Sequence, residues 1–291
     1  MPAVDCAIPV LGRPWQTALA LLTLLRHSGR HIRRVWFEDR PGDPLKHDVR
    51  WVARVVLSAF AHVEVVYWRA RHNDSLVDYD RAASDSLYRL DFPFQRAWEY
   101  CGDRPLVVLH NDMRFVSDEV PLMLTALFGP TVGVGRIGIC HACPAHRNGC
   151  QGSASYEAYR PSYPELVSLI RRSPPTRMVE EIIDPSAPWP LTECRLNEMF
   201  AIVQPSVVRD LVFPRGSIPI LGEQHIRVDG GVRWFAGLCR AGFRFQHYEH
   251  AAVHRAGYPT FTDLDGYLAR EAEARELVVA MPEIQGIPLP C

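Results

Sequence analysis

The chain has 291 residues, of which 47% are hydrophobic, and its 32 basic residues are balanced by 33 acidic ones, giving a formal net charge of −1. A chain of this length and composition can bury a full-sized core, which excludes the disordered and fibrous classes. It carries no block of basic residues of the kind that binds nucleic acid through phosphates, so nucleic acid is not an expected partner.

The N-terminal sequence lacks the charged-then-apolar order of a signal peptide, and no run approaches the roughly 18 apolar residues that a membrane span needs. We therefore expect a cytoplasmic protein without a transmembrane segment, while contact with a membrane surface stays open. Eight cysteines in such a chain favour thiols or metal ligands over a disulfide framework.

Strands and helices alternate in the first half of the chain. Residues 4–10 predict a short buried strand, and Pro14 begins an amphipathic helix that ends near Ser28 and Gly29. The segment 38–43 is rich in Pro, Gly and acidic residues and should end the second strand. Further strands are expected at 32–37, 63–68 and 105–110, with helices at 51–60 and around Trp98. This order predicts a mostly parallel sheet that binds ligands beyond the carboxyl ends of its strands.

The second half is less regular. Residues 140–164 are rich in Cys, Gly, Ser, Tyr and Pro and predict a long loop, which is usually functional or held by a ligand. The proline-rich stretch 172–190 should cross the surface with little regular structure. Strands are expected at 198–203 and 243–248, and helices at 231–241 and 267–279.

The strand at 105–110 runs directly into a polar triplet, His110, Asn111 and Asp112, after which the apolar pattern resumes at Met113. A carboxylate at the end of a parallel strand can hold a divalent cation, and such a cation can stabilise a diphosphate leaving group. The alternative is a turn in which Asn111 and Asp112 cap their own backbone. The triplet alone leaves both interpretations open, and His110 is expected only to shape the turn.

With its surroundings, this stretch resembles the family 2 nucleotide-sugar glycosyltransferases of the GT-A fold along nearly the whole chain. The matching segments follow the family's order. They are the turn at 9–14, the acidic stretch 37–43, Asn73 after the third strand, the Asp-x-Asp-like element at 109–115, the helical region 229–245 and His254 after the last core strand. Three departures are present: Gly12 replaces the usual Asn, Asn111 replaces an acid, and Asp229 precedes two glycines where the family has a Glu-Asp pair.

The resemblance implies an α/β chain with a mostly parallel central sheet flanked by helices, that is, the GT-A fold of nucleotide-diphospho-sugar transferases with a Cys-rich loop inserted. We expect a single domain over residues 1–291. Its parts would be a nucleotide-sugar-binding half at 1–118, an acceptor half at 119–265 that includes the Cys-rich loop 140–164, and a C-terminal helix and tail at 266–291.

The resemblance also implies an activity. It is that of a glycosyltransferase of the hexosyltransferase type, dependent on Mn or Mg, which moves a sugar from a nucleotide-diphosphate donor to an acceptor hydroxyl. Inversion is expected, and retention stays open. The acceptor would be a saccharide, a lipid-linked molecule or a small molecule, and a homodimer stays open. Two alternatives remain. One is a nucleotidyltransferase, although no Gly-rich turn with Arg and Lys follows the first strand, and the other is a catalytically impaired binding protein, which the three departures favour.

Particular residues take roles by this resemblance. Asp229 is the first candidate for the general base and Glu223 the second, although Asp229 suits a helix N-cap equally well. Asp112 and His254 would hold the catalytic metal ion. The donor would be bound by residues at the strand ends and turns, with Glu38 and Asp39 facing the nucleoside and Arg13 and Arg255 available to the phosphates; these residues are Pro9, Arg13, Glu38, Asp39, Asn73, Asn111 and Arg255.

A cysteine cluster has no counterpart in the family. Cys140, Cys143 and Cys150 lie within eleven residues, and Cys194 follows at a distance. Together with two neighbouring histidines they supply enough soft ligands for a tetrahedral structural zinc ion. An iron–sulfur cluster, unpaired thiols and an incidental disulfide are the alternatives.

Overall fold

The structure is a computed structural model that describes residues 3–138, 143–146, 148–172, 183–189, 191, 194–224, 230–255 and 263–290. Its first half contains β1 (Val4–Val10), α1 (Pro14–Ser28), β2 (Ile32–Asp39), α2 (Arg50–Ala59), β3 (Glu64–Arg69), α3 (Tyr79–Ser84), α4 (Ser86–Leu90), α5 (Gln95–Tyr100), β4 (Leu106–Leu109), β5 (Met113–Arg114) and α6 (Val120–Thr125). Its second half contains β6 (Thr131–Ile137), α7 (Tyr163–Arg172), β7 (Leu196–Val203), α8 (Pro205–Val208), α9 (Val232–Arg240), β8 (Arg244–His247), β9 (Val253–His254) and α10 (Leu264–Val279). Among the described helices, none combines the length and the apolar character that crossing a bilayer requires.

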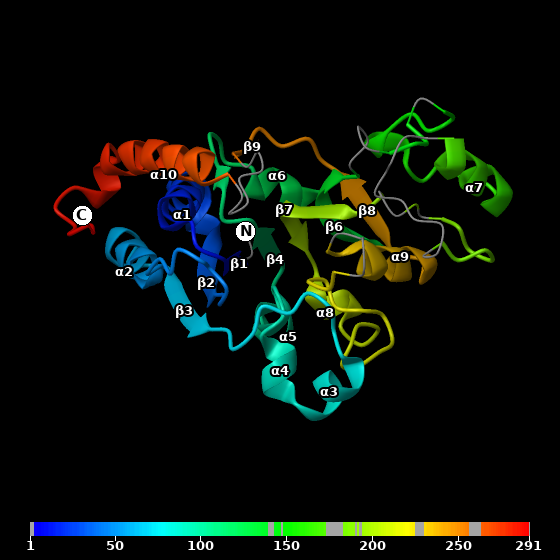
Figure 1. The fold of residues 1–291 in the computed structure, drawn as a ribbon, viewed down its shortest axis with the longest axis horizontal. Helices are drawn as coiled ribbons and strands as arrows, with labels where there is room; N and C mark the ends of the chain where they lie inside the picture. Colours follow the sequence, from blue (N-terminus) through cyan, green and yellow to red (C-terminus); the bar gives the residue numbers. More distant parts are fainter. Residues whose placement is uncertain are drawn as a thin grey trace.

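A seven-stranded sheet with the order β3-β2-β1-β4-β7-β6-β8 forms the centre of the molecule (Figure 1). Strands β1 to β4 are parallel, β7 is antiparallel to both β4 and β6, and β8 is parallel to β6. A separate two-stranded ribbon pairs β5 with β9. The predicted α/β class with a mostly parallel central sheet is confirmed.

Apolar layers cover both faces of the sheet. Cys6 and Ile8 of β1 belong to a buried cluster with α1, α2 and α10, whereas Ala7 faces a second cluster with α5 and α9. The same alternation along β4 sends Val107 to the first cluster and Val108 to the second. A strand buried on both faces needs a continuous apolar run, and this need explains why the sequence identifies β1 and β4 clearly.

The second strand is longer than the sequence predicted: the prediction ended it at residue 37, whereas β2 ends at Asp39. β2 continues through Glu38 and Asp39, because both residues pair with the end of β1 and Asp39 also pairs with Arg69 of β3. The acidic residues therefore belong to the strand, and the chain turns only after them. Acidic residues have a low strand propensity, so the sequence predicts that the strand ends before them. Pairing with the two neighbouring strands, β1 and β3, outweighs this low propensity.

Strand β6 was not expected from the sequence. Its segment contains Gly133 and Gly135, which weaken strand propensity. A Cβ atom at Gly133 would lie 2.7 Å from the Phe245 ring, and one at Gly135 would lie 2.9 Å from Cβ of Ala201. The glycines are required by close packing against β8 and β7, so the feature that hides the strand is also what allows it to form.

The first and last helices are joined at the beginning of α1. The residue before α1, Arg13, has a left-handed conformation (φ 54°) and supplies no side-chain cap. Glu271 of α10 instead accepts hydrogen bonds from the backbone N–H groups of Trp15 (2.9 Å) and Gln16 (3.2 Å). A carboxylate at a helix N-terminus satisfies unpaired N–H groups and interacts favourably with the helix dipole. Helix α10 therefore holds the turn that carries Arg13.

Replacing Glu271 with alanine should lower the free energy of unfolding by about 1–3 kcal/mol, because buried N–H groups lose their acceptor. Urea denaturation followed by circular dichroism measures the change. Glu276→Gln, on an exposed position of the same helix, is the matched control and should change stability little. Equal stability losses in the two variants would contradict the role given to Glu271.

Candidate metal and donor site

Asp112 lies just beyond the carboxyl end of β4 and is held there by the β5–β9 ribbon. Met113 pairs with His254 in this ribbon, and the Arg255 N–H donates a hydrogen bond of 2.8 Å to the backbone carbonyl of Asp112. Strand pairing fixes the relative position of side chains on the two strands. Two segments that are distant in the sequence thus bring Asp112 and His254 together.

His110, Asp112 and His254 form a group of metal-ligand donors whose ligand atoms all lie within 4.8 Å of one another. Nε2 of His254 is 3.1 Å from Oδ1 of Asp112. Both atoms are buried, and neither makes a well-formed hydrogen bond within the described part of the chain. No other group of three or more such donors occurs among the residues that the structure describes. Buried polar atoms that face each other in this way suit a shared cation, so the donors fit a metal ion.

The charge states of the group suit the same role. Burial by itself would raise the pKa of the Asp112 carboxyl, but the contact with His254 and the charges of His254, His110 and Arg13 outweigh it and lower the pKa to about 2. Burial lowers the pKa of His110. A carboxylate that is ionised and an imidazole that is neutral near pH 7 both present lone pairs to a cation.

Arg13 contacts the other side of the Asp112 carboxylate. Its Nη1 is 2.5 Å from Oδ2 of Asp112, and its backbone N–H donates to the Tyr267 hydroxyl at 2.9 Å. Arg13 is thus held at the end of β1, with its guanidinium group against the metal-ligand group. The sequence prediction placed this arginine near phosphates, and its position at the carboxyl edge of the sheet is compatible with that role.

The residues expected to contact the nucleoside lie along the same edge of the sheet. Glu38 is buried and forms an ion pair with Arg40, whose Nε also donates to Oδ1 of Asn73 at 2.8 Å. Asp39 accepts a hydrogen bond of 2.5 Å from the Tyr67 hydroxyl and is more accessible than Glu38. Pro9 lies opposite Glu38 in the β1–β2 register. Of the two acidic residues, Asp39 is therefore the better placed to meet a ligand.

Asn111 and Arg255 are occupied by contacts within the chain. The Asn111 side-chain amide donates to the Thr17 hydroxyl at 3.2 Å and to the Gly12 carbonyl at 3.4 Å. The Arg255 guanidinium group forms an ion pair with Glu273 of α10. Their predicted contacts with the donor stay predictions.

The two candidates for the general base differ in what the structure says of them. Asp229 lies outside the described residues. Glu223 is buried, and its Oε1 accepts a hydrogen bond of 2.9 Å from Nη1 of Arg233. Because Oε1 of Glu223 is engaged with Arg233, Asp229 stays the first candidate.

The cysteine prediction is not supported in the described part of the chain. Cys150 and Cys194 are buried in an apolar cluster with Ile183 and Leu191, and the Cys150 sulfur accepts a hydrogen bond from the Gly152 N–H. With Cys143 they form no group of three close donors among the described residues; Cys140 lies outside these residues. Buried cysteines often act as small apolar side chains, and the packing here is of that kind.

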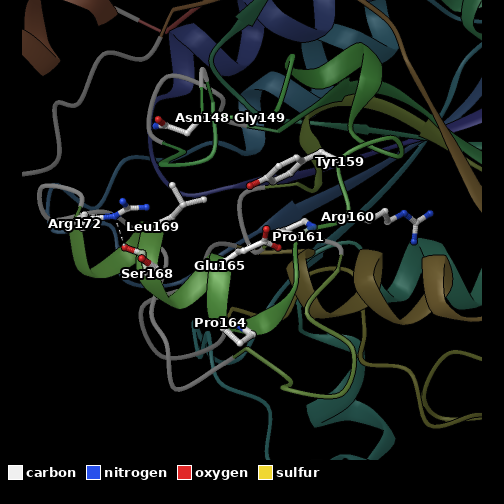
Figure 2. Close-up of a pocket in the computed structure, with 10 residues that line it drawn as sticks. All are labelled: Asn148, Gly149, Tyr159, Arg160, Pro161, Pro164, Glu165, Ser168, Leu169 and Arg172. Atoms are coloured by element: carbon white, nitrogen blue, oxygen red, sulfur yellow. Dashed lines mark hydrogen bonds between the residues drawn. The ribbon is translucent and has the colours of Figure 1, made fainter.

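A hollow lies between residues 148–161 and helix α7, and Figure 2 shows the residues that line it. Its volume is about 600 Å³. Its charged lining residues are engaged within the chain. Glu165 accepts hydrogen bonds from Ser162 at the start of α7, and Arg172 donates to the Ser168 carbonyl. None of the metal-ligand residues lines this hollow, and we assign no ligand to it.

Comparison with known proteins places the fold. No protein-family model matches the chain, and no curated protein matches its sequence. A solved mannosyltransferase from Pyrobaculum calidifontis, in complex with GDP-Man and Mn²⁺, superposes with a TM-score of 0.51 at 8% identity, over 98% of this chain and 68% of that one. Glucosyl-3-phosphoglycerate synthase from Mycobacterium tuberculosis, in complex with Mn²⁺, UDP and phosphoglyceric acid, gives a TM-score of 0.46 at 11% identity, over 97% and 80% of the two chains. The chain has the GT-A fold of the nucleotide-sugar glycosyltransferases, as the sequence predicted.

The buried carboxylate of Glu119 accepts hydrogen bonds from residues 248–251, the segment that leads to His254. Glu119, at the start of α6, accepts hydrogen bonds from the Tyr248 hydroxyl (2.7 Å) and the Ala251 N–H (3.1 Å), and from the Ser117 hydroxyl (2.6 Å). Burial would raise the pKa of Glu119, but these hydrogen bonds outweigh it and lower the pKa. The ionised form of Glu119 therefore stabilises the folded protein.

Glu119→Gln should lower the free energy of unfolding by about 1–3 kcal/mol near neutral pH, because the hydrogen bonds to a charged acceptor are weakened. A group whose pKa is lowered by folding stabilises the protein above its unfolded value, 4.5, and this contribution is lost as the pH falls through the folded-state value. Urea denaturation between pH 7 and pH 3 should therefore show the difference between the variant and the wild type shrinking below pH 4.5. A difference that stays constant over this range would contradict the assignment.

Proposed function

We propose that this protein is a metal-dependent glycosyltransferase that transfers a sugar from a nucleotide-diphosphate donor to an acceptor hydroxyl, with inversion. The observation that carries the proposal is the group of His110, Asp112 and His254 at the carboxyl edge of a GT-A sheet. Ligands of open α/β sheets bind at this edge. The superposed mannosyltransferase carries GDP-Man and Mn²⁺, which supports the choice of donor class and cation.

Asp112, His254 and His110 would hold the cation. A divalent ion there would stabilise the negative charge that develops on the departing diphosphate. The donor set accounts for the buried Asp112 Oδ1 and His254 Nε2 atoms, which lack well-formed hydrogen bonds among the described residues.

Arg13 is the residue that we assign to the phosphates. Phosphate groups often bind at the free N–H groups of a helix N-terminus, but Glu271 already accepts from the N–H groups of Trp15 and Gln16 at the start of α1. Apart from the cation, positive charge for a diphosphate at this point must therefore come from a side chain. The Arg13 guanidinium group is next to Asp112 and can make bidentate hydrogen bonds to phosphate oxygens.

The remaining roles follow the sequence prediction. Asp39, Asn73 and Pro9 would line the nucleoside side of the site, and Asp229 would take the proton from the acceptor hydroxyl as its oxygen attacks the sugar. Proton removal during attack makes the hydroxyl oxygen a better nucleophile, and bringing the two substrates together lowers the entropic part of the barrier.

Asp112→Asn tests the proposal. Wild-type protein with Mn²⁺ should release nucleoside diphosphate from at least one UDP-, GDP- or dTDP-linked sugar. The variant should lose about 100-fold or more of this turnover, because a charged metal ligand has been removed. Circular dichroism checks that the variant is folded. The matched control is Asp103→Asn, an exposed carboxylate before the opposite end of β4, which should keep wild-type turnover.

Two results would count against the proposal. Wild-type protein that neither binds nor hydrolyses any of the three donors with Mn²⁺ would rule out a nucleotide-sugar enzyme of this kind. Protein that binds a donor by calorimetry but turns over none, with or without acceptors, would favour the impaired binding protein that the sequence left open.

A further inference from the structure

The proposed cation site has an unusual balance of donors. It offers two imidazoles and one carboxylate, whereas Mg²⁺ prefers oxygen ligands in octahedral geometry and retains several waters. Imidazole is a good ligand for Fe, Co, Ni, Cu and Zn ions, and a set of two histidines and one carboxylate is typical of transition metals. Whether His110 is a ligand beside Asp112 and His254 therefore affects which cation the site prefers.

We infer that His110, the third of the residues proposed to hold the cation, makes the site selective for a transition-metal ion over Mg²⁺. The inference rests on the proposed function and narrows the choice between Mn and Mg that the sequence left open. It also gives His110 a role in place of the turn-shaping role that the sequence suggested.

The position of His110 is fixed by the sheet. Its N–H donates to the Met199 carbonyl at 3.0 Å, which extends the pairing of β4 with β7 by one residue beyond Leu109. Its side chain therefore leaves the sheet at its carboxyl edge, where Asp112 follows two residues later. The ring centroids of His110 and His254 are 5.9 Å apart, so both rings lie beside the same carboxylate.

The surroundings of the His110 ring indicate a ligand more than a packing residue. In the described part of the chain no hydrogen bond holds this ring, although an acidic side chain lies near it. Oε1 of Glu198 on β7 is 3.8 Å from Nε2 of His110, and Glu198 is itself held by an ion pair with Arg195. Histidines that bind metals commonly have a carboxylate nearby that orients the ring. Glu198 lies on the side of the ring where such a carboxylate would be found, at a distance longer than a hydrogen bond.

The alternative is a ring that only fills space beside His254. The ligand atoms of both rings and of Asp112 nevertheless all lie within 4.8 Å of one another. Nε2 of His254 and Oδ1 of Asp112 also face each other without a well-formed hydrogen bond among the described residues, as polar atoms that share a cation would. The observed grouping therefore favours metal binding by all three residues.

The test measures metal binding without any donor. Protein treated with a chelator is titrated by calorimetry with Co²⁺, Mn²⁺ and Mg²⁺. Wild-type protein should bind one Co²⁺ at least about 100-fold more tightly than Mg²⁺. His110→Ala should weaken Co²⁺ and Mn²⁺ binding by about 10-fold or more. His110→Asp restores a ligand of oxygen type, so it should bind Mg²⁺ more tightly than the alanine variant and show a smaller preference for Co²⁺.

His62→Asp is the matched control, because His62 is an exposed histidine before β3 and should leave all three affinities unchanged. Circular dichroism and thermal melting show whether each variant is folded, and the two His110 variants test the same ligand independently. Equal Co²⁺ affinity in wild-type and folded His110 variants would overturn the inference, as would wild-type binding of Mg²⁺ as tightly as Co²⁺. Co²⁺ binding that is lost only when thiols are blocked would also overturn it.

The metal-binding test can fail or succeed independently of the test of sugar transfer. If metal binding depends on His110 as described but no nucleotide sugar is turned over, the inference about the ligand holds and the proposed activity fails. If sugar transfer occurs but His110 variants bind Co²⁺ like wild type, the activity holds and the inference fails.

Discussion

The buried carboxylate of Asp112 is the constraint around which the functional edge of this protein is built. An isolated charge in a protein interior costs several kcal/mol unless it is paired. Here Arg13 from the turn after β1 forms an ion pair with the carboxylate, and His254 from β9 contacts its other oxygen. Because these partners come from opposite ends of the chain, the termini must be brought to the central strand for Asp112 to be buried.

Several contacts hold the Arg13 side of this arrangement. Gly12 has a φ of 62°, and a Cβ atom at this position would lie about 3 Å from the Asp43 carboxylate. Asp43 is hydrogen-bonded to His47, whose ring contacts the Tyr267 hydroxyl. The same hydroxyl accepts from the Arg13 N–H. The first turn of the fold is thus fixed by the last helix, so the C-terminal segment belongs to the site and not only to the periphery.

The sequence predicts the helices and strands that have a local hydrophobic pattern. It misses features that depend on contacts between residues distant in the sequence. β1, α1 and β4 are found because a doubly buried strand and an amphipathic helix show themselves in a short window. His110 looks like a turn residue because its relation to His254 arises only from the β5–β9 ribbon, and neither two-residue strand has a recognisable pattern. The zinc prediction rests on spacing and stays a prediction, since Cys140 lies outside the described residues; spacing does not show that Cys150 and Cys194 lie in an apolar cluster.

Two departures from the family, Gly12 and Asn111, are in contact in the structure. Gly12 and Asn111 each weakened the prediction of activity when taken alone, since the family has Asn and an acid at these positions. In the fold the Asn111 amide donates to the carbonyl of Gly12 and to the Thr17 hydroxyl. An acid at position 111 could donate to neither, and it would place a second negative charge next to Asp112. Asn111 therefore joins β4 to the start of α1 through contacts that an acid could not make, whereas the carbonyl of residue 12 would be present with any side chain. Both departures leave the contact between Asp112 and His254 in place.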